Sequence, residues 1–98
     1  MPDAYIPGEV ARISAAVADI TGVAADPGGV RLLVKAGNAV AVAYIYGVDA
    51  IIVRDSLGNY HADLPLTSAG QWAYRWELTA PNAGAAEGVI AVQKSHVI

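Results

Sequence analysis

The sequence predicts an all-β protein whose strands form a two-layered β-sandwich. Three observations lead to this prediction. Apolar and polar residues alternate with a period of two in several short runs. Turn-forming residues separate these runs at intervals of roughly 8–14 residues, and no segment makes a strong case for a helix. With 98 residues, the chain suits a single domain over residues 1–98.

The first third of the chain is expected to hold a lead-in and one strand. Residues 1–8 contain prolines and a glycine and are predicted to be extended. Residues 9–19 are predicted to form a strand, because Ile13 and Val17 fit a period of two. A helix is the alternative for this run, since alanine favours helices. Turns are predicted at residues 21–22 and 26–29.

Three apolar strands are predicted next, over residues 30–35, 39–46 and 50–55. Residues 36–38 are expected to form a short hairpin loop between the first two, and residues 56–59 the turn after the third. The residues expected to point inward from the first two strands are Val30, Leu32, Val34, Val40, Val42, Tyr44 and Tyr46.

Residues 57–78 are expected to supply the centre of the core. In the first half Tyr60, Ala62 and Leu64 alternate with polar residues, and both tryptophans of the chain lie in the second half. Aromatic side chains bury about 150–250 Å² each, so they should dominate the core. The predicted core aromatics are Tyr60, Trp72, Tyr74 and Trp76. The Tyr60 hydroxyl is also expected to donate a hydrogen bond across a strand corner.

A last strand is predicted over residues 87–95, after a turn at residues 81–84, with Ile90 and Val92 inward. The resulting seven short strands indicate a seven-stranded immunoglobulin-like or fibronectin-like β-sandwich. A small barrel is the second possibility.

Composition argues against several classes of function. The net charge of −3 comes with no basic stripe, so nucleic acid is a poor partner. No apolar run reaches the roughly 18 residues that a membrane span needs, and the N-terminal residues do not resemble a signal peptide. Cysteine is absent. We therefore expect no membrane, no small-molecule substrate and no cofactor.

No catalytic or metal-binding residue is predicted. His61 and Asp63 should share one outward strand face, but a stable metal site needs three or four ligands. The other histidine is His96. The serines lack a nucleophile elbow and no phosphate-binding loop occurs, so we expect a protein that is not an enzyme.

The face opposite the predicted core side is unusually apolar. An exposed sheet face is normally polar, whereas charged residues make up only 15% of this chain. Apolar patches above a few hundred Å² usually mark an interface. The candidate interface residues are Ala39, Ala41, Ala43, Ile45, Ala50, Ile52, Val89 and Ala91. Exposed alanines of no consequence are the alternative.

The chain from Tyr44 to Ser95 resembles small proteins encoded among the structural genes of tailed bacteriophages, and residues 7–19 look like the opening strand of that family. Those share the patterns Y-x-Y-G-x-D-A-x-x-V-x-D-S-x-G-x-Y-H-A-D, A-G-x-W-x-Y-R-W-E and A-x-E-G-x-[FI]-x-V. The matching positions run from Tyr44 to Asp63, from Ala69 to Glu77 and from Ala85 to Val92. The chain departs from the pattern at residues 78–81, where a glycine-rich turn is expected.

The resemblance implies an immunoglobulin-like virion domain: a capsid decoration, a neck or head–tail connector accessory, or a tail-associated domain. Its expected partners are other virion proteins, copies of itself, or both, after synthesis in the host cytoplasm. A glycan- or host-surface-binding module is the first alternative. It requires at least two of Trp72, Trp76, Tyr44 and Tyr46 to face solvent. An enzyme or metal chaperone is the second, and it requires His61 and His96 to converge with acidic residues.

Overall fold

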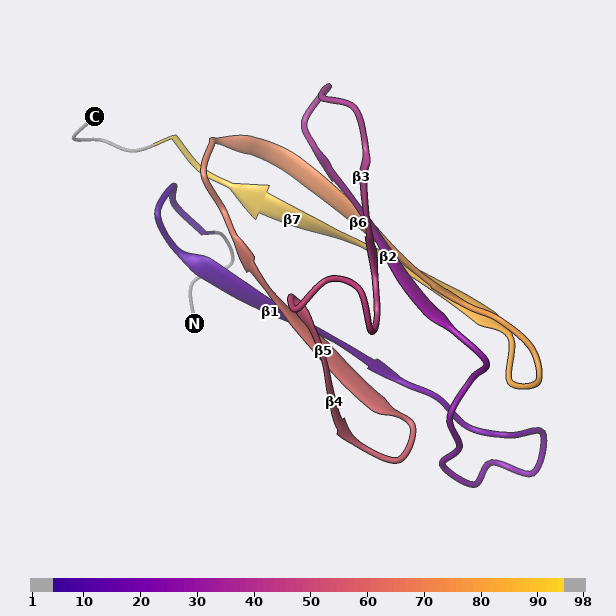
Figure 1. Ribbon diagram of the computed structural model, residues 1–98. Coiled ribbons are helices and arrows are strands. Elements are labelled where there is room, and N and C mark those ends of the chain that lie inside the picture. Colours follow the sequence, from indigo (N-terminus) through magenta and orange to yellow (C-terminus); the bar gives the residue numbers. More distant parts are fainter. Residues whose placement is uncertain (1–4, 95–98) are drawn as a thin grey trace.

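The computed structural model describes residues 5–94, which form two antiparallel sheets packed face to face (Figure 1). The smaller sheet has the order β1-β5-β4, and the larger has the order β3-β2-β6-β7. Every described strand pairs antiparallel with its neighbours inside these sheets. The prediction of an all-β sandwich with seven strands is therefore confirmed, and neither a helix nor a closed barrel forms in residues 5–94.

The smaller sheet consists of β1 (Val10–Ala16), β4 (Ile52–Ser56) and β5 (Asn59–Pro65). Along β5 every second residue is buried, as the alternation of apolar and polar side chains requires. β1 spans the full length of β5, whereas β4 covers it only as far as the pair formed by Ile52 and Ala62. A bulge between Arg54 and Ser56 interrupts the pairing of β4.

The larger sheet consists of β2 (Val30–Ala36), β3 (Val42–Ile45), β6 (Gly70–Leu78) and β7 (Gly84–Val92). β6 and β7 form a long hairpin that pairs over the whole of both strands. β2 pairs with β6 on one side and with the short strand β3 on the other. The predicted strand over residues 39–46 is thus reduced to its second half.

The core lies between the two sheets and receives inward side chains from both. Trp76 is its largest member and is only 1% exposed. The buried residues are Ala11, Ile13, Val17, Val30, Leu32, Val34, Ile52, Tyr60, Ala62, Leu64, Leu66, Trp72, Trp76, Ile90 and Val92. The indole N–H of Trp72 donates to the carbonyl of Ser68 at 3.1 Å. The Trp76 indole N–H is buried without a partner among the described residues.

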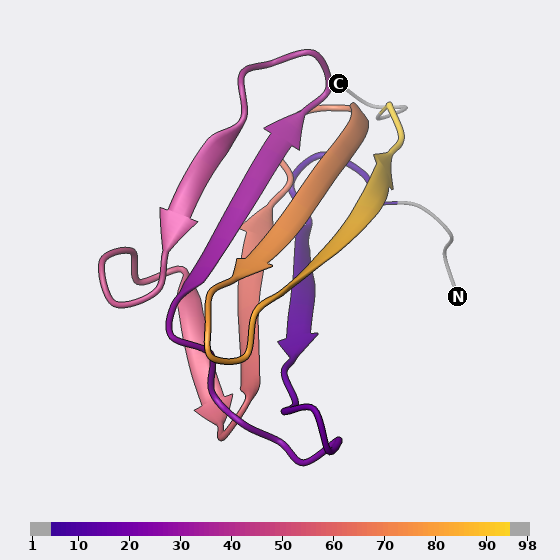
Figure 2. The same cartoon turned by 90° about the vertical axis from the view of Figure 1, so that its right-hand side faces the viewer.

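One lateral side of the sandwich is built differently from the other (Figure 2). After β3 the chain crosses from the larger sheet to the smaller one and continues as β4. These two short strands therefore share one side of the molecule. The other side is formed by β1 and β7, whose ends lie near the N-terminal segment that bonds to β7 through Tyr5.

Candidate interaction surface

The outer face of the larger sheet carries a network of ion pairs at one end. The Arg31 guanidinium donates to Glu77, with Nε 2.8 Å from Oε1. Arg75 bridges Glu77 and Glu87, with Nε 3.0 Å and Nη1 2.9 Å from their carboxylate oxygens. The hydrogen bond from Arg31, followed by that from Arg75, lowers the pKa of Glu77. Exposed pairs of this kind contribute little stability, but they fix the orientation of the charges.

The other end of the same face is apolar and hollowed. A depression of about 330 Å³ lies over β2, β6 and β7 beside the residues that lead into β3. Its apolar lining comes from Leu33, Ala41, Ala73 and Val89, and its charged lining comes from Lys35, Arg75 and Glu87. Residues of outward parity on β7 and β3 extend this apolar area to Ala91 and Ala43. We call the area formed by Leu33, Ala41, Ala43, Ala73, Val89 and Ala91 the apolar patch.

The structure distributes the predicted interface residues over three environments. Ala41, Ala43, Ile45, Val89 and Ala91 are exposed on or beside the outer face of the larger sheet. Ala39 and Ala50 are exposed in loops that flank β3 and β4. Ile52 is only 4% exposed and lies in the core, so its assignment to the outer surface was wrong. The expected continuous apolar face is also interrupted, because the charged rows of Arg31, Arg75 and Glu77 cross it.

Most of the aromatic side chains are enclosed. Tyr60, Trp72 and Trp76 are buried, and Tyr74 and Tyr44 are half-buried against the core. Tyr46 is exposed, and its ring packs edge-on against Tyr60 with centroids 5.3 Å apart. The glycan-binding alternative required two solvent-facing rings from Trp72, Trp76, Tyr44 and Tyr46. Tyr46 is the one exposed ring of these four, so they do not form a stacking platform of two rings.

A polar row crosses the outer face of the smaller sheet. His61 on β5 lies with Nδ1 2.7 Å from Asp55 Oδ2 and Nε2 4.0 Å from Asp63 Oδ2. Asp63 in turn accepts from Arg12 Nε at 2.7 Å, and this hydrogen bond lowers its pKa. The sequence pointed to Asp63 as the neighbour of His61 but missed Asp55, which reaches the histidine from the bulge in β4.

No group of three or more histidine, cysteine, aspartate or glutamate residues in the range 5–94 is arranged to hold a metal ion. His96, the other histidine considered for such a site, lies outside the described residues. The polar row of the smaller sheet instead has the geometry of side-chain contacts that join neighbouring strands.

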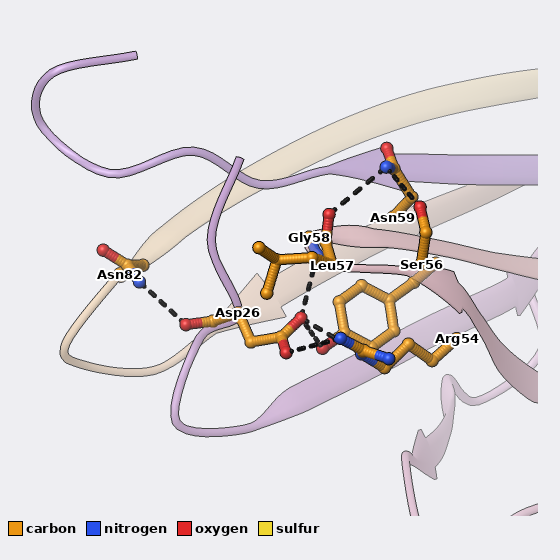
Figure 3. Close-up of polar contacts among 8 residues, drawn as sticks. Asp26, Arg54, Ser56, Leu57, Gly58, Asn59 and Asn82 are labelled. Carbon is orange, nitrogen blue, oxygen red and sulfur yellow. Dashed lines mark hydrogen bonds and ion pairs between the residues drawn. The ribbon is translucent and has the colours of Figure 1, made fainter. Parts of the chain in front are cut away.

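Asp26 organises the loops at one end of the sandwich (Figure 3). Its carboxylate accepts from Arg54 Nη2 at 3.0 Å, from the backbone N–H of Gly58 at 2.8 Å and from the Tyr60 hydroxyl at 2.9 Å. Its carbonyl accepts from Asn82 Nδ2 at 2.7 Å. The three donors to the carboxylate, with Arg54 first, lower the pKa of Asp26 to about 2. The cluster ties three loops together and leaves the carboxylate fully engaged.

Comparisons with family models, with curated proteins and with solved structures found no match for this chain. Among the described residues, no helix is long and apolar enough to cross a membrane.

Proposed function

We propose that this chain is a non-enzymatic structural protein of a tailed-bacteriophage particle. It attaches to other proteins of the particle through the outer face of its larger sheet. The apolar patch supplies the buried area of the contact, and the neighbouring ion-pair network of Arg31, Glu77, Arg75 and Glu87 sets its orientation.

The apolar patch is the observation that carries this proposal. Antiparallel sheets that face water are normally polar on that side, whereas Leu33, Ala73 and Val89 line a hollow on an exposed face. Interfaces combine apolar contacts with polar ones, and this face offers both. Small residues such as Ala41 and Ala73 also let a partner approach the backbone closely.

The strand order gives further support. An arrangement of β1-β5-β4 opposite β3-β2-β6-β7 is the order expected of an immunoglobulin-type sandwich that lacks its first strand. This order agrees with the expectation drawn from the sequence resemblance, in which an immunoglobulin-like domain decorates or connects parts of a virion. Fold alone does not determine function, so the surface remains the main argument.

The proposal is tested on purified particles of the virus that encodes the chain. Quantitative mass spectrometry should find the chain at a fixed ratio to the major coat protein. Val89→Lys, which puts a charge in the hollow, should sharply reduce this ratio. Val23→Lys is the matched control, because Val23 is 61% exposed and Val89 60%, yet Val23 lies in the β1–β2 loop.

Two results would contradict the proposal. Absence of the wild-type chain from the particles would exclude a structural role. An equal loss of incorporation for Val23→Lys and Val89→Lys would show that the outer face of the larger sheet is not the attachment surface. Circular dichroism of both purified variants should show an unchanged fold.

A further inference from the structure

We infer that the free edge of β3 pairs with the same edge of a second copy of this chain, which joins two larger sheets into one continuous sheet. This contact goes beyond the proposed attachment through the outer face. It uses a different surface, the lateral side on which β3 and β4 lie (Figure 2).

Unpaired sheet edges tend to recruit further strands, and proteins usually block them. The edge of β7 is engaged by Tyr5, whose N–H donates to the Ala91 carbonyl at 3.0 Å and whose carbonyl accepts from Gln93 at 2.6 Å. The same strand carries Glu87 on its exposed side. One edge of the larger sheet is thereby protected.

The two edges of the smaller sheet are also protected. β4 is short, contains a bulge and presents the charged residues Arg54 and Asp55. β1 carries Arg12 near its middle, held in an ion pair with Asp63. Charges and bulges of this kind are the usual devices against edge-to-edge pairing.

The edge of β3 is short as well, but it carries no charged residue, no proline and no bulge. Residues 36–48 contain no charged residue and no proline. Val42 is 51% exposed and Val40 89% exposed. In a symmetric pair each residue meets residues of the same segment. A charge-free segment is therefore suited to pairing with itself, because no like charges are brought together.

The backbone of β3 leaves a defined set of groups free. The N–H of Tyr46 donates to the Val30 carbonyl at 3.0 Å, so alternate residues from Tyr46 backwards face β2. The intervening residues Ile45, Ala43 and Ala41 direct their backbone groups toward the open edge. The backbone groups of Ile45 are already hydrogen-bonded to Asp49. The Asp49 carboxylate accepts from the Ile45 N–H at 2.8 Å, and the Asp49 N–H donates to the Ile45 carbonyl at 2.8 Å.

This arrangement favours a register that leaves Ile45 unpaired. If the two-fold axis passes beside Val42, Ala41 of each copy lies opposite Ala43 of the other. Both alanines then exchange N–H···O bonds with their counterparts, and the Asp49 cap on Ile45 is undisturbed. A shift that paired Ile45 would break that cap. The pairing is isologous and closes as a dimer.

The same register covers an open groove. Because β4 ends its pairing at Ala62, the sandwich is left open beside Leu64, where a groove of about 270 Å³ lies between the sheets. Val42 and Trp72 are among its apolar lining residues. Val42 of each copy forms the central, non-hydrogen-bonded pair, in which side chains approach most closely. The side chain of the second copy is thus placed at the mouth of this groove.

Sedimentation equilibrium of the purified chain tests the pairing. The apparent mass of the wild-type chain should rise with concentration and level off at the mass of two chains. Val42→Lys and Val42→Glu should each be monomeric at concentrations at which the wild type is dimeric, because like charges then stand opposite each other. An equimolar mixture of the two variants should recover the dimer. Val89→Lys should leave the dimer unchanged.

Ala43→Pro provides a second variant that does not depend on charge. It removes an N–H that faces the open edge, where proline is tolerated, and it should also abolish the dimer. A wild-type chain that stays monomeric, a mass above two chains, or a lysine–glutamate mixture that stays monomeric would each overturn the inference. Each of these results leaves the effect of Val89→Lys on particle incorporation unchanged. The pairing of β3 edges and the attachment through the outer face are therefore tested independently.

Discussion

Gly88→Ala is expected to destabilise the protein through one neighbour, Tyr74. These residues lie opposite each other in the β6–β7 ladder, and the Tyr74 ring occupies the space above the glycine. A Cβ at position 88 would stand 2.7 Å from Tyr74 Cε2 and closer still to the end of the ring. Gly88 is not among the glycines with positive φ, so the backbone itself accepts alanine.

The size of the effect follows from two opposing terms. Overpacking of a well-filled site costs about 1–3 kcal/mol. Replacing glycine by alanine at a compatible position gains about 0.4–1 kcal/mol by restricting the unfolded chain. We therefore expect Gly88→Ala to lower the free energy of unfolding by about 1–2 kcal/mol. Urea denaturation should show this as a lower midpoint with an unchanged slope.

Two further variants of this chain test the steric explanation. In a Tyr74→Ala background the obstructing ring is gone, and Gly88→Ala should then become neutral or stabilising. Gly84→Ala on the same strand is the control, because its Cβ would meet only the Leu78 side chain at 3.8 Å. An equal cost of Gly88→Ala with and without the Tyr74 ring would refute the steric explanation.

Three other outcomes can be measured on the isolated protein. Ile52→Ala should cost about 2–5 kcal/mol in urea denaturation, because its side chain is in the core. Val53→Ala, on the outer side, should change stability by no more than about 0.5 kcal/mol; equal effects would contradict the core placement. The pKa of Asp26 is about 2 in the fold, against an ordinary value of 3.8. Its contribution to stability is therefore present above pH ~4 and lost as the pH falls toward ~2. Thermal melts should show less acid sensitivity in Asp26→Asn. Tyr60→Phe removes a donor to Asp26 and should raise the carboxyl pKa measured by carbon-13 NMR; an unchanged value would mean that this hydrogen bond is absent in solution.

Alternation predicted the fold where polar and apolar residues contrast clearly. On β5 the polar residues His61 and Asp63 separate Ala62 from its buried neighbours, so only one face could enter the core. Residues 50–53 offer no such contrast, because both alternating sets are apolar. Nothing local then decides which set points inward, and Ile52 was assigned to the wrong side.

The strand at residues 39–46 shows a different limit. The predicted inward parity holds for Tyr44 and Val42, which border the core and the groove. Parity is a local property, whereas burial requires an opposing layer. The layer that would cover Val42 is absent because β4 stops short. The length of β4 depends on the path of the chain after residue 45, which an alternation pattern does not encode.

The polar clusters depend on contacts between distant residues. A turn at residues 26–29 and a hydrogen bond from the Tyr60 hydroxyl were both predicted. That Asp26 in this turn accepts the Tyr60 hydrogen bond was not predicted. The acceptor lies 34 residues away in the chain, and the partner of His61 is set by a bulge. Local patterns identify that such side chains need partners, while the sheet register decides which partners they receive.

The crossing from β3 to β4 connects these observations to the proposed pairing. A chain that leaves the larger sheet after Ile45 adds no further strand beside β3, and by joining the smaller sheet at Ile52 it leaves β5 uncovered beyond Ala62. Asp49, inside the crossing, caps the end of β3 and so confines the unpaired backbone to the residues around Ala43. The free edge is therefore short enough to pair with one strand of a second copy, and no unpaired edge is left for a third copy. In this fold, the connection that opens the edge also limits the size of the assembly that the edge can build.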